Sequence, residues 1–247
     1  MKKILDFFTQ TWIGSFGLVF SIYFFVIQHF IVPSPSMEKT MLVGDIFFAK
    51  KFSYGIPIPR LPFLEIALLP DFNNNGHILK GDGPEKGDVV VFRYMKNEKM
   101  YFVKRCIATE GDEVIYYDKN LLIHSKNKDF MKNNNTISFN NKLWVVNPYK
   151  DNGSNYINNI DKPEDSSFNQ LLNSEKPIDM IQKTDSKLGT YFYKKISNDS
   201  YYMMGDNRNN SYDSRFFGEV NYKYIVGQAF FTFFSFSDKT RSFSFIK

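Results

Sequence analysis

The stretch IVPSPSM (Ile31–Met37) closes a long apolar run and opens the polar part of the chain. From Phe7 to Val32 the sequence contains no Lys, Arg, Asp or Glu. The 20 residues of Ile13–Val32 would extend over about 30 Å as a helix, which matches the hydrocarbon core of a bilayer. The sequence therefore predicts an amino-terminal tail and a single transmembrane helix within residues 1–32.

A cleaved signal peptide is the competing interpretation of this run. The apolar core of a signal peptide usually has about 7–15 residues and ends at a small-x-small cleavage site. This run is longer, and Val32–Ser34 matches such a site poorly, so an uncleaved anchor is favoured. Charge alone does not settle the orientation, because Lys2–Lys3 precede the run whereas Lys39 and Lys50–Lys51 follow it.

Short segments rich in Val, Ile, Phe and Tyr recur after the anchor, each bounded by Gly, Asp or Asn. Such segments are typical of β-strands, and no long stretch after the anchor shows helical periodicity. The sequence therefore predicts a mostly β fold. The predicted strands are Ile46–Ala49, Asp88–Arg93, Tyr101–Ile107, Glu113–Tyr117, Leu143–Val146, Tyr201–Met204 and Ile225–Phe236.

A shift in composition divides the polar part of the chain. Residues 131–160 contain 10 Asn, so we interpret 126–186 as an Asn-rich insertion with long loops. Residues 33–125 and 187–247 would then form one β-rich domain. A second apolar stretch, LPFLEIALLP (Leu61–Pro70), is too short to cross a bilayer. It would either be buried in the core or dip into the membrane interface beside the anchor.

Composition limits the possible partners. The 247-residue chain has a formal charge of +5 with its lysines scattered. This charge would suit an anionic membrane or nucleic acid, but the chain has neither a basic block nor a readable DNA-binding helical domain, so no nucleic-acid partner is predicted. The single cysteine, Cys106, excludes an intramolecular disulfide and a multi-Cys zinc site. Three histidines share no metal-ligand spacing, so neither a metal nor a cofactor is expected.

Ser36 and Lys104 are the candidate catalytic pair. A serine is a weak nucleophile without an adjacent base, and none of the histidines lies in a pattern with an Asp partner. A lysine amine can act as that base if burial among apolar neighbours lowers its pKa. In the strand YFVKR (Tyr101–Arg105), Lys104 shares a face with Phe102 and opposes Val103 and Arg105. By itself this signal is weak, since most lysines on half-buried strands are solvated.

Two polar groups could support that pair. The Ser34 hydroxyl and the main-chain N–H of Ser36 could bind a developing oxyanion, although Ser34 could equally be a loop serine without a role. The segment GDNRNNSYDSR (Gly205–Arg215) is the densest polar cluster of the chain. Its Asp and Asn residues could build tight turns. Asp213 and Arg215 could also pair and hold a neighbouring group in place.

Five segments, in order and with matching spacing, together resemble the bacterial type I signal peptidases, the leader peptidase family. The resemblance covers the anchor, 31–55, 86–114 and 201–236, and leaves the insertion at 126–186 uncovered. The five segments are Pro33–Met41 (PSPSMEKTM), Lys51–Gly55 (KFSYG), Lys86–Phe92 (KGDVVVF), Tyr101–Arg105 with Glu110–Asp112 (YFVKR and EGD), and Gly205–Gly218.

The resemblance implies a role for each matching residue. Ser36 would be the nucleophile, Lys104 the general base and Ser34 an oxyanion-hole donor. Ser211 would orient Lys104, and Asp213 and Arg215 would form a supporting ion pair. Val32, Pro33, Met37 and Phe102 would contribute to the pockets for the small residues at positions −1 and −3 of a signal peptide.

The resemblance also implies a fold, a location and partners. The expected fold is a mostly antiparallel β structure of coiled sheets behind a transmembrane helix. The expected activity is removal of signal peptides from exported preproteins after a small-x-small motif. The enzyme would lie in the bacterial cytoplasmic (inner) membrane as a single-pass protein, with its catalytic domain on the extracytoplasmic face. Its partners would be preprotein signal peptides, the lipid bilayer and, transiently, the secretion machinery.

Two residues depart from the family pattern. Pro35 stands where many members have Gly, and Lys39 where Pro is common. Proline fixes φ and removes an N–H, so Pro35 predicts a local difference in the loop, while Lys39 adds a second amine near Ser36. A catalytically silent, membrane-anchored scaffold is therefore the competing function, although Ser36, Lys104 and Ser211 all remain in place.

Overall fold

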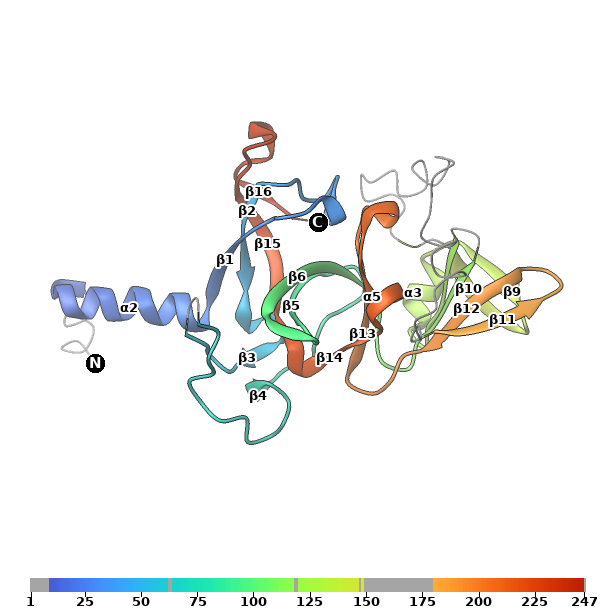
Figure 1. Cartoon of the computed structure of the whole chain (residues 1–247), viewed down its shortest axis with the longest axis horizontal. Coiled ribbons are helices and arrows are strands. Elements are labelled where there is room, and N and C mark those ends of the chain that lie inside the picture. Colours follow the sequence, from blue (N-terminus) through green and yellow to red (C-terminus); the bar gives the residue numbers. More distant parts are fainter. Residues whose placement is uncertain (1–8, 62–63, 118–119, 147, 149–179, 247) are drawn as a thin grey trace.

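The computed structural model describes residues 9–61, 64–117, 120–146, 148 and 180–246. Its described part is mostly antiparallel β-structure, as the sequence predicts, arranged as two large sheets and a small hairpin. In Figure 1 the helix α2 (Trp12–Phe25) extends from one end of the molecule, and the strands of the second sheet form the other end.

The first sheet carries the candidate catalytic residues. Within the described residues it has eight strands, in the order β1-β2-β15-β5-β6-β13-β14, and β16 pairs with β15. Strands β5 and β6 pair in register, with Val90 opposite Lys104 and Phe92 opposite Phe102. The strands are β1 (Ile27–Ile31), β2 (Ile46–Lys50), β5 (Val89–Tyr94), β6 (Asn97–Ala108), β13 (Ser200–Met204), β14 (Val220–Asn221), β15 (Ile225–Phe234) and β16 (Ser244–Phe245).

The second sheet has six strands among the described residues, in the order β11-β12-β7-β8-β10-β9. A separate hairpin pairs β3 (Gly55–Pro57) with β4 (His77–Lys80), and the short helix α3 (Lys128–Lys132) precedes β9. The six strands are β7 (Glu113–Tyr117), β8 (Asn120–His124), β9 (Thr136–Phe139), β10 (Lys142–Val146), β11 (Ile181–Asp185) and β12 (Gly189–Lys195).

All seven predicted strands are confirmed, within a few residues at their ends. Nine further strands of the described residues were not predicted, and two of them, β9 and β11, fall inside the predicted 126–186 insertion. These two strands extend the sheet that β7 and β8 begin. β9 joins it through β10, which pairs with β8, and β11 joins it through β12, which pairs with β7. Residues 149–179 of the predicted insertion lie outside the described residues, and its boundaries remain a prediction.

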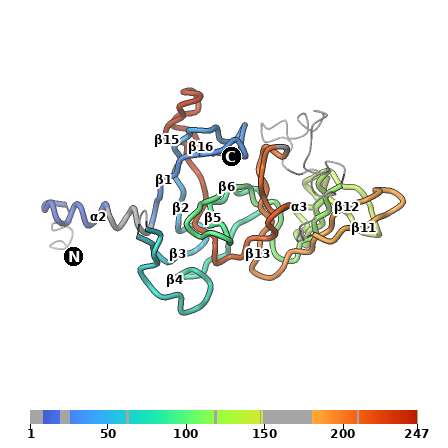
Figure 2. The backbone as a smooth tube through the Cα atoms, in the orientation of Figure 1, coloured from blue at the N-terminus to red at the C-terminus, as the bar shows by residue number. Residues whose placement is uncertain are grey.

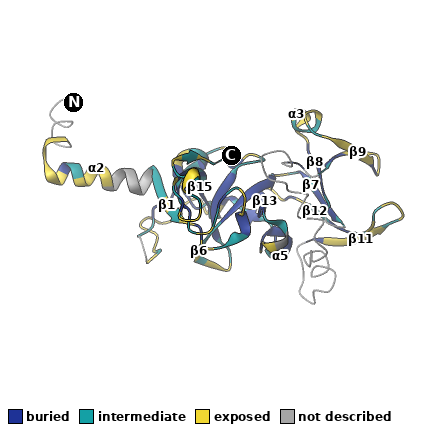
Figure 3. Cartoon of the chain, turned by 90° about the horizontal axis from the view of Figure 1, so that it is seen from above, coloured by how far each residue is buried: buried dark blue, intermediate teal, exposed yellow. Residues whose placement is uncertain are grey.

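The buried side chains concentrate in the middle of the two sheets. In Figure 3, β13 and the second half of β6 are buried, whereas the described side chains of α2 are mostly exposed. The core cluster under the candidate site joins β2, β5, β6 and β15 to the segment that carries Ser36. Its buried members are Val32, Met37, Met41, Phe47, Ala49, Val89, Val91, Val103, Val226 and Ala229.

The predicted transmembrane helix over Ile13–Val32 is wrong in its extent. Helix α2 ends at Phe25, and Ile27–Ile31 form β1, which pairs with β2 from Ile27 opposite Lys50 to Ile31 opposite Ile46. The tube in Figure 2 shows β1 beside β2, in a direction different from that of the coloured part of α2. The sheet recruits these residues because β2 satisfies their backbone groups and Phe30 stacks on Phe47, with ring centroids 5.6 Å apart. Among the described residues, no helix is long and apolar enough to cross a membrane.

The apolar stretch Leu61–Pro70 lies in the loop between β3 and β4. Burial in the core is wrong for four of its large apolar side chains, since Leu64, Ile66, Leu68 and Leu69 are all exposed. Residues 62 and 63 lie outside the described residues.

Candidate active site

Ser36 lies in a 3-10 helix of one turn, η1 (Pro35–Met37), which begins directly after Ser34. Pro35 occupies the first position of this turn, where a fixed φ is favourable and the missing N–H has no partner to lose. The departure from the family pattern at Pro35 is therefore compatible with the local backbone. Because Ser36 is in the first turn, its main-chain N–H has no acceptor inside the turn and is available to a ligand.

Lys104 reaches Ser36 from the middle of β6. Its Nζ donates a 2.7 Å hydrogen bond to Ser36 Oγ and a 2.9 Å bond to the carbonyl oxygen of Val103. Both side chains are buried, and 68 residues of sequence separate them. The Phe102 ring, on the same face of the strand, lies 5.5 Å from Nζ. The structure therefore brings together the two residues that the sequence selected as nucleophile and base.

The surroundings of Lys104 favour a neutral amine. Desolvation by burial lowers the pKa of Lys104 to about 8, against the opposing charges of Asp213 and Asp206, which raise it. Desolvation, which penalises the ammonium form, is the largest of these effects. An amine with this pKa exists in part as the free base near neutral pH, so it can accept the proton of a hydroxyl 2.7 Å away.

Two hydrogen-bond donors lie beside this pair. Ser34 Oγ is 3.2 Å from Ser36 Oγ, and the main-chain N–H of Ser36 lies in the same turn. A hydroxyl and a main-chain N–H close to a nucleophile are the kinds of donor that stabilise a tetrahedral intermediate.

The pair opens into a cavity of about 450 Å³, formed mainly by β6 and the segment before η1. Pro33 and Phe102 line this cavity, as predicted for substrate-binding residues. Val32 and Met37 are at most 1% exposed and belong to the core cluster, so they lie beneath the cavity and shape it indirectly. The cavity is also lined by three residues that were not predicted, namely Tyr101, Met100 and Tyr212.

Asp213 and Arg215 form the predicted ion pair. Arg215 Nε donates to Asp213 Oδ1 and Arg215 Nη2 donates to Asp213 Oδ2, both at 2.9 Å. Both residues are fully buried. Asp213 also accepts the N–H of Gly205, which fixes the loop that follows β13. Arg215 is the main charge that lowers the pKa of Asp213, against the opposing effect of burial.

Ser211 is buried beside the pair but does not bond to Lys104, whose hydrogen bonds go to Ser36 and Val103. It packs against the backbone of Gly205: a Cβ added at Gly205 would lie 2.2 Å from Ser211 Oγ and 2.5 Å from the carbonyl oxygen of Ser36. Gly205 is thus required by the close approach of these two segments.

Four further residues complete the site, although no role was predicted for them. They are Arg105, Asp206, Thr40 and Asn207. Arg105 Nη2 lies 2.7 Å from Asp206 Oδ2, and the Thr40 hydroxyl donates to the same oxygen. The N–H of Asn207 donates to the carbonyl oxygen of Ser36 at 3.0 Å. The alternation of the strand was the available signal, since Arg105 must point away from Lys104 and its buried charge needs a carboxylate.

No group of three or more His, Cys, Asp or Glu side chains in the described part of the chain could hold a metal ion. The site described above consists of hydroxyl, amine, amide and carboxylate groups of the chain itself.

Comparison with known proteins places this chain in a family. The sequence profile described as "Signal peptidase, peptidase S26" matches residues 6–234. A "Signal peptidase I" of Helicobacter pylori is 43% identical over 244 residues, covering 94% of this chain and 83% of its own length. A "Signal peptidase I" of Buchnera aphidicola subsp. Schizaphis graminum is 32% identical, covering 91% of this chain and 73% of its own length. One of Pseudomonas aeruginosa is 29% identical, covering 88% of this chain and 68% of its own length. Since the profile matches most of the chain and relatives above 30% identity are covered over more than two thirds of their length, this chain belongs to the signal peptidase family, peptidase S26.

Proposed function

We propose that this chain is a membrane-associated serine endopeptidase that removes signal peptides from exported preproteins after a small-x-small motif. Ser36 is its nucleophile and Lys104 its general base. The observation that carries the proposal is the 2.7 Å contact between Lys104 Nζ and Ser36 Oγ at the wall of a cavity of about 450 Å³.

Acylation begins when neutral Lys104 takes the proton of the Ser36 hydroxyl. Ser36 Oγ then attacks the carbonyl carbon of the small residue at position −1, and the carbonyl oxygen becomes an oxyanion. Ser34 Oγ and the Ser36 N–H stabilise this oxyanion. The Lys104 ammonium returns the proton to the leaving amine, so the mature protein departs and the signal peptide remains as an ester on Ser36.

Deacylation repeats the same proton transfers with water in place of the hydroxyl. Neutral Lys104 takes a proton from water, and the resulting hydroxide attacks the ester carbonyl. The oxyanion forms at the same donors, and its collapse returns the proton from Lys104 to Ser36 Oγ. Asp213–Arg215 and Arg105–Asp206 hold the surrounding loops in place during both steps.

An open strand edge supports binding of an extended peptide. Strand β6 pairs with β5 from Asn97 to Arg105, whereas β13 pairs only with Arg105, Cys106 and Ala108. On the edge of β6 that faces away from β5, the residues before Arg105 therefore have no partner in β13. The cavity lies along this part of β6, next to Lys104. A cleavage region could add there as a further strand, with its small residues turned towards Pro33 and Phe102 and towards the surface shaped by Val32 and Met37.

We place the enzyme at the bacterial cytoplasmic membrane, with its catalytic domain on the extracytoplasmic face. The apolar residues before β1 support this location, because Trp12, Ile13, Phe16 and Val19 of α2 are exposed. The preprotein would be retained in the same bilayer by its own apolar segment, which raises its local concentration at the site. Its partners are thus preprotein signal peptides and lipid, with transient proximity to the secretion machinery.

The test is cleavage of a preprotein with a small-x-small site by the purified full-length protein in detergent. Wild type should cleave at that site, whereas Ser36→Ala and Lys104→Ala should lose nearly all activity. Lys99→Ala is the matched control, because Lys99 is exposed on the same strand as Lys104. Near wild-type cleavage by Lys104→Ala would refute the dyad. No cleavage by folded wild type, across several preproteins, would favour the silent scaffold.

A further inference from the structure

The loop between β3 and β4 presents a row of apolar side chains to solvent. Their exposed fractions range from 45% for Leu69 to 85% for Phe72. Large apolar side chains that are exposed together on one loop are a feature of interaction surfaces. Its described members are Leu64, Ile66, Leu68, Leu69 and Phe72, and we call this set the apolar row.

The loop that carries the apolar row is held by its own hydrogen bonds. The N–H of Leu61 donates to Ile66, the N–H of Leu68 donates to Pro59, and Arg60 forms a bridge with Ala67. Arg60 Nη1 also donates to the carbonyl oxygen of Glu65 at 3.1 Å. The exposure of the row is therefore a consequence of a folded loop and not of an unstructured one.

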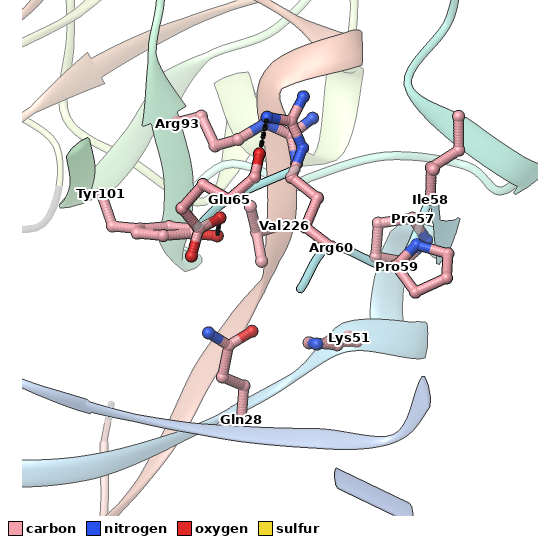
Figure 4. A pocket seen from close by; sticks show the side chains of 10 residues that line it. All are labelled: Gln28, Lys51, Pro57, Ile58, Pro59, Arg60, Glu65, Arg93, Tyr101 and Val226. Atoms are coloured by element: carbon pink, nitrogen blue, oxygen red, sulfur yellow. Dashed lines mark hydrogen bonds between the residues drawn. The ribbon is translucent and has the colours of Figure 1, made fainter. Parts of the chain in front are cut away.

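Two cavities meet behind this loop at Arg60 and Arg93, which line both of them. The smaller cavity, of about 30 Å³, is shown in Figure 4, where Lys51, Gln28 and the Glu65 carboxylate surround its open centre. The larger one, of about 540 Å³, includes Leu68 and Leu69 of the apolar row in its lining. Its volume is within the range of cavities that bind small organic ligands.

The two cavities carry an excess of positive charge. Their linings contain four cationic and three anionic side chains, namely Lys51, Arg60, Arg93 and Lys223 against Glu65, Asp71 and Glu98. Asp71 is already engaged by the N–H groups of Asn75 and Gly76, and Glu65 by the Tyr101 hydroxyl.

Arg93 is the group that an anion would satisfy best. It is 5% exposed, and its Nη2 donates to the carbonyl oxygen of Lys223. Its Nε is buried and makes no hydrogen bond; Glu98 Oε2, which already accepts from Arg60, is 3.9 Å away. A buried guanidinium N–H without an acceptor is costly, and a phosphate oxygen is an acceptor for which arginine geometry is well suited.

We propose that the cavities behind the β3–β4 loop bind the phosphate of an anionic phospholipid, while the apolar row lies among the acyl chains next to it. Arg60 and Arg93 contact the phosphate, and Leu68 and Leu69 contact the glycerol end of the chains. A cationic site bordered by exposed apolar side chains is complementary to a lipid headgroup and its tails, whereas a free anion would leave the apolar row uncovered.

The position of the site relative to α2 supports a bilayer as the occupant. Gln28, at the start of β1, lines the smaller cavity, and the N–H of Lys51 donates to the carbonyl oxygen of Val26. The site therefore adjoins the end of α2, whose own described apolar side chains are exposed. In Figure 1 the β3–β4 loop passes close to this junction.

The test uses the full chain in neutral detergent, titrated with dihexanoyl-phosphatidylglycerol and, separately, with inorganic phosphate. We expect the lipid to bind at least about tenfold more tightly than inorganic phosphate, and Arg60→Gln to raise the lipid Kd by at least about tenfold. Lys142→Gln is the matched control, because Lys142 also forms a 2.5 Å ion pair with a glutamate, Glu113 in the second sheet. Its lipid Kd should equal that of wild type.

A second pair of variants tests the apolar contact without changing charge. Leu69→Ser should weaken lipid binding and leave phosphate binding unchanged, whereas Leu143→Ser, at an exposed leucine in the second sheet, should change neither. Equal affinities of wild type for lipid and inorganic phosphate would overturn the proposal in favour of a free-anion site. Equal lipid affinities of Arg60→Gln and Lys142→Gln would also overturn it. Binding is measured without a peptide substrate, so failure here is distinguishable from failure of the proposed peptidase activity.

Discussion

Arg105 and Asp206 form a buried ion pair with two parallel hydrogen bonds, 3.0 Å from Nε to Oδ1 and 2.7 Å from Nη2 to Oδ2. Arg105 follows Lys104 in β6, and Asp206 lies in the loop after β13. The same Asp206 carboxylate accepts the Thr40 hydroxyl, four residues after the nucleophile. One carboxylate therefore connects the strand of the base with the loop of the nucleophile.

Asp206→Asn should destabilise the protein strongly. Removing one partner of a buried pair leaves the other charge uncompensated, which typically costs about 3–5 kcal/mol. Urea unfolding of wild type and variant measures this loss. The matched control is Asp199→Asn, because Asp199 pairs with Lys80 at an exposed position and should cost less than about 1 kcal/mol. Equal losses at the two positions would contradict the role given to Asp206.

The pH dependence of cleavage should report the Lys104 amine. Burial lowers the pKa of Lys104 to about 8, and only the neutral amine accepts the Ser36 proton. The neutral fraction grows as pH rises, so kcat/KM should increase about tenfold per pH unit below 8 and level off above it. Initial rates between pH 6 and about 10 measure this rising limb of the pH profile of kcat/KM. A rate independent of pH across this range would contradict Lys104 as the base.

The neighbouring carboxylates should influence the same limb. Asp213 and Asp206 raise the pKa of Lys104 because their negative charges favour the ammonium form. In folded Asp206→Asn, loss of that charge should move the rising limb to lower pH, even if the maximum rate falls. The same profile measured with Asp199→Asn should stay at the wild-type position.

The pairing of Ser36 with Lys104 could be predicted from sequence because the segments that contain them, weak signals one by one, resemble one family when taken together. Ser36 follows a long uncharged run, and Lys104 lies in an alternating apolar strand. The contacts that hold them were harder to predict because they are long-range: Arg105 meets Asp206 across 101 residues of sequence. Alternation shows that Arg105 faces away from Lys104, but it does not identify the carboxylate that Arg105 meets.

The amino-terminal segment shows a different limit of sequence patterns. Composition alone makes Ile27–Ile31 a continuation of an apolar helix, since a short apolar strand and a segment of apolar helix have similar hydropathy. The pairing partner Ile46–Lys50 decides the outcome, and a window confined to residues 13–32 does not contain it. The strands β9 and β11 were missed for a related reason, because most of their residues are exposed and their hydrophobic alternation is weak.

Ser34→Ala should reduce kcat by about 10²–10³-fold with a small change in KM, as for loss of one oxyanion donor. The hydroxyl lies 3.2 Å from Ser36 Oγ, so it can reach the oxygen that becomes charged. Ser34→Thr keeps the hydroxyl and should retain much more activity than Ser34→Ala. Steady-state kinetics on one preprotein measures both variants. Equal activity of Ser34→Ala and wild type would leave the main-chain N–H of Ser36 as the sufficient donor.

Arg241 should position the nucleophile from the carboxyl-terminal end of the chain. Its guanidinium donates to the carbonyl oxygens of Lys39, at 3.0 Å, and of Thr40. Lys39 has a φ of 82°, an unfavourable backbone conformation for a lysine, so the turn after Ser36 depends on contacts that hold it in place.

Arg241→Ala should therefore lower kcat by about tenfold while KM changes little, since a small displacement of the nucleophile affects the reacting geometry more than binding. Arg241→Lys, which can reach one carbonyl oxygen but not both with a planar fork, should recover part of the loss. The control is Lys239→Ala, an exposed residue of the same turn. If Arg241→Ala kept the wild-type kcat, the contacts with the loop after β13 would suffice to hold the turn after Ser36. These contacts include the hydrogen bonds of Thr40 to Asp206 and of Asn207 to Glu38.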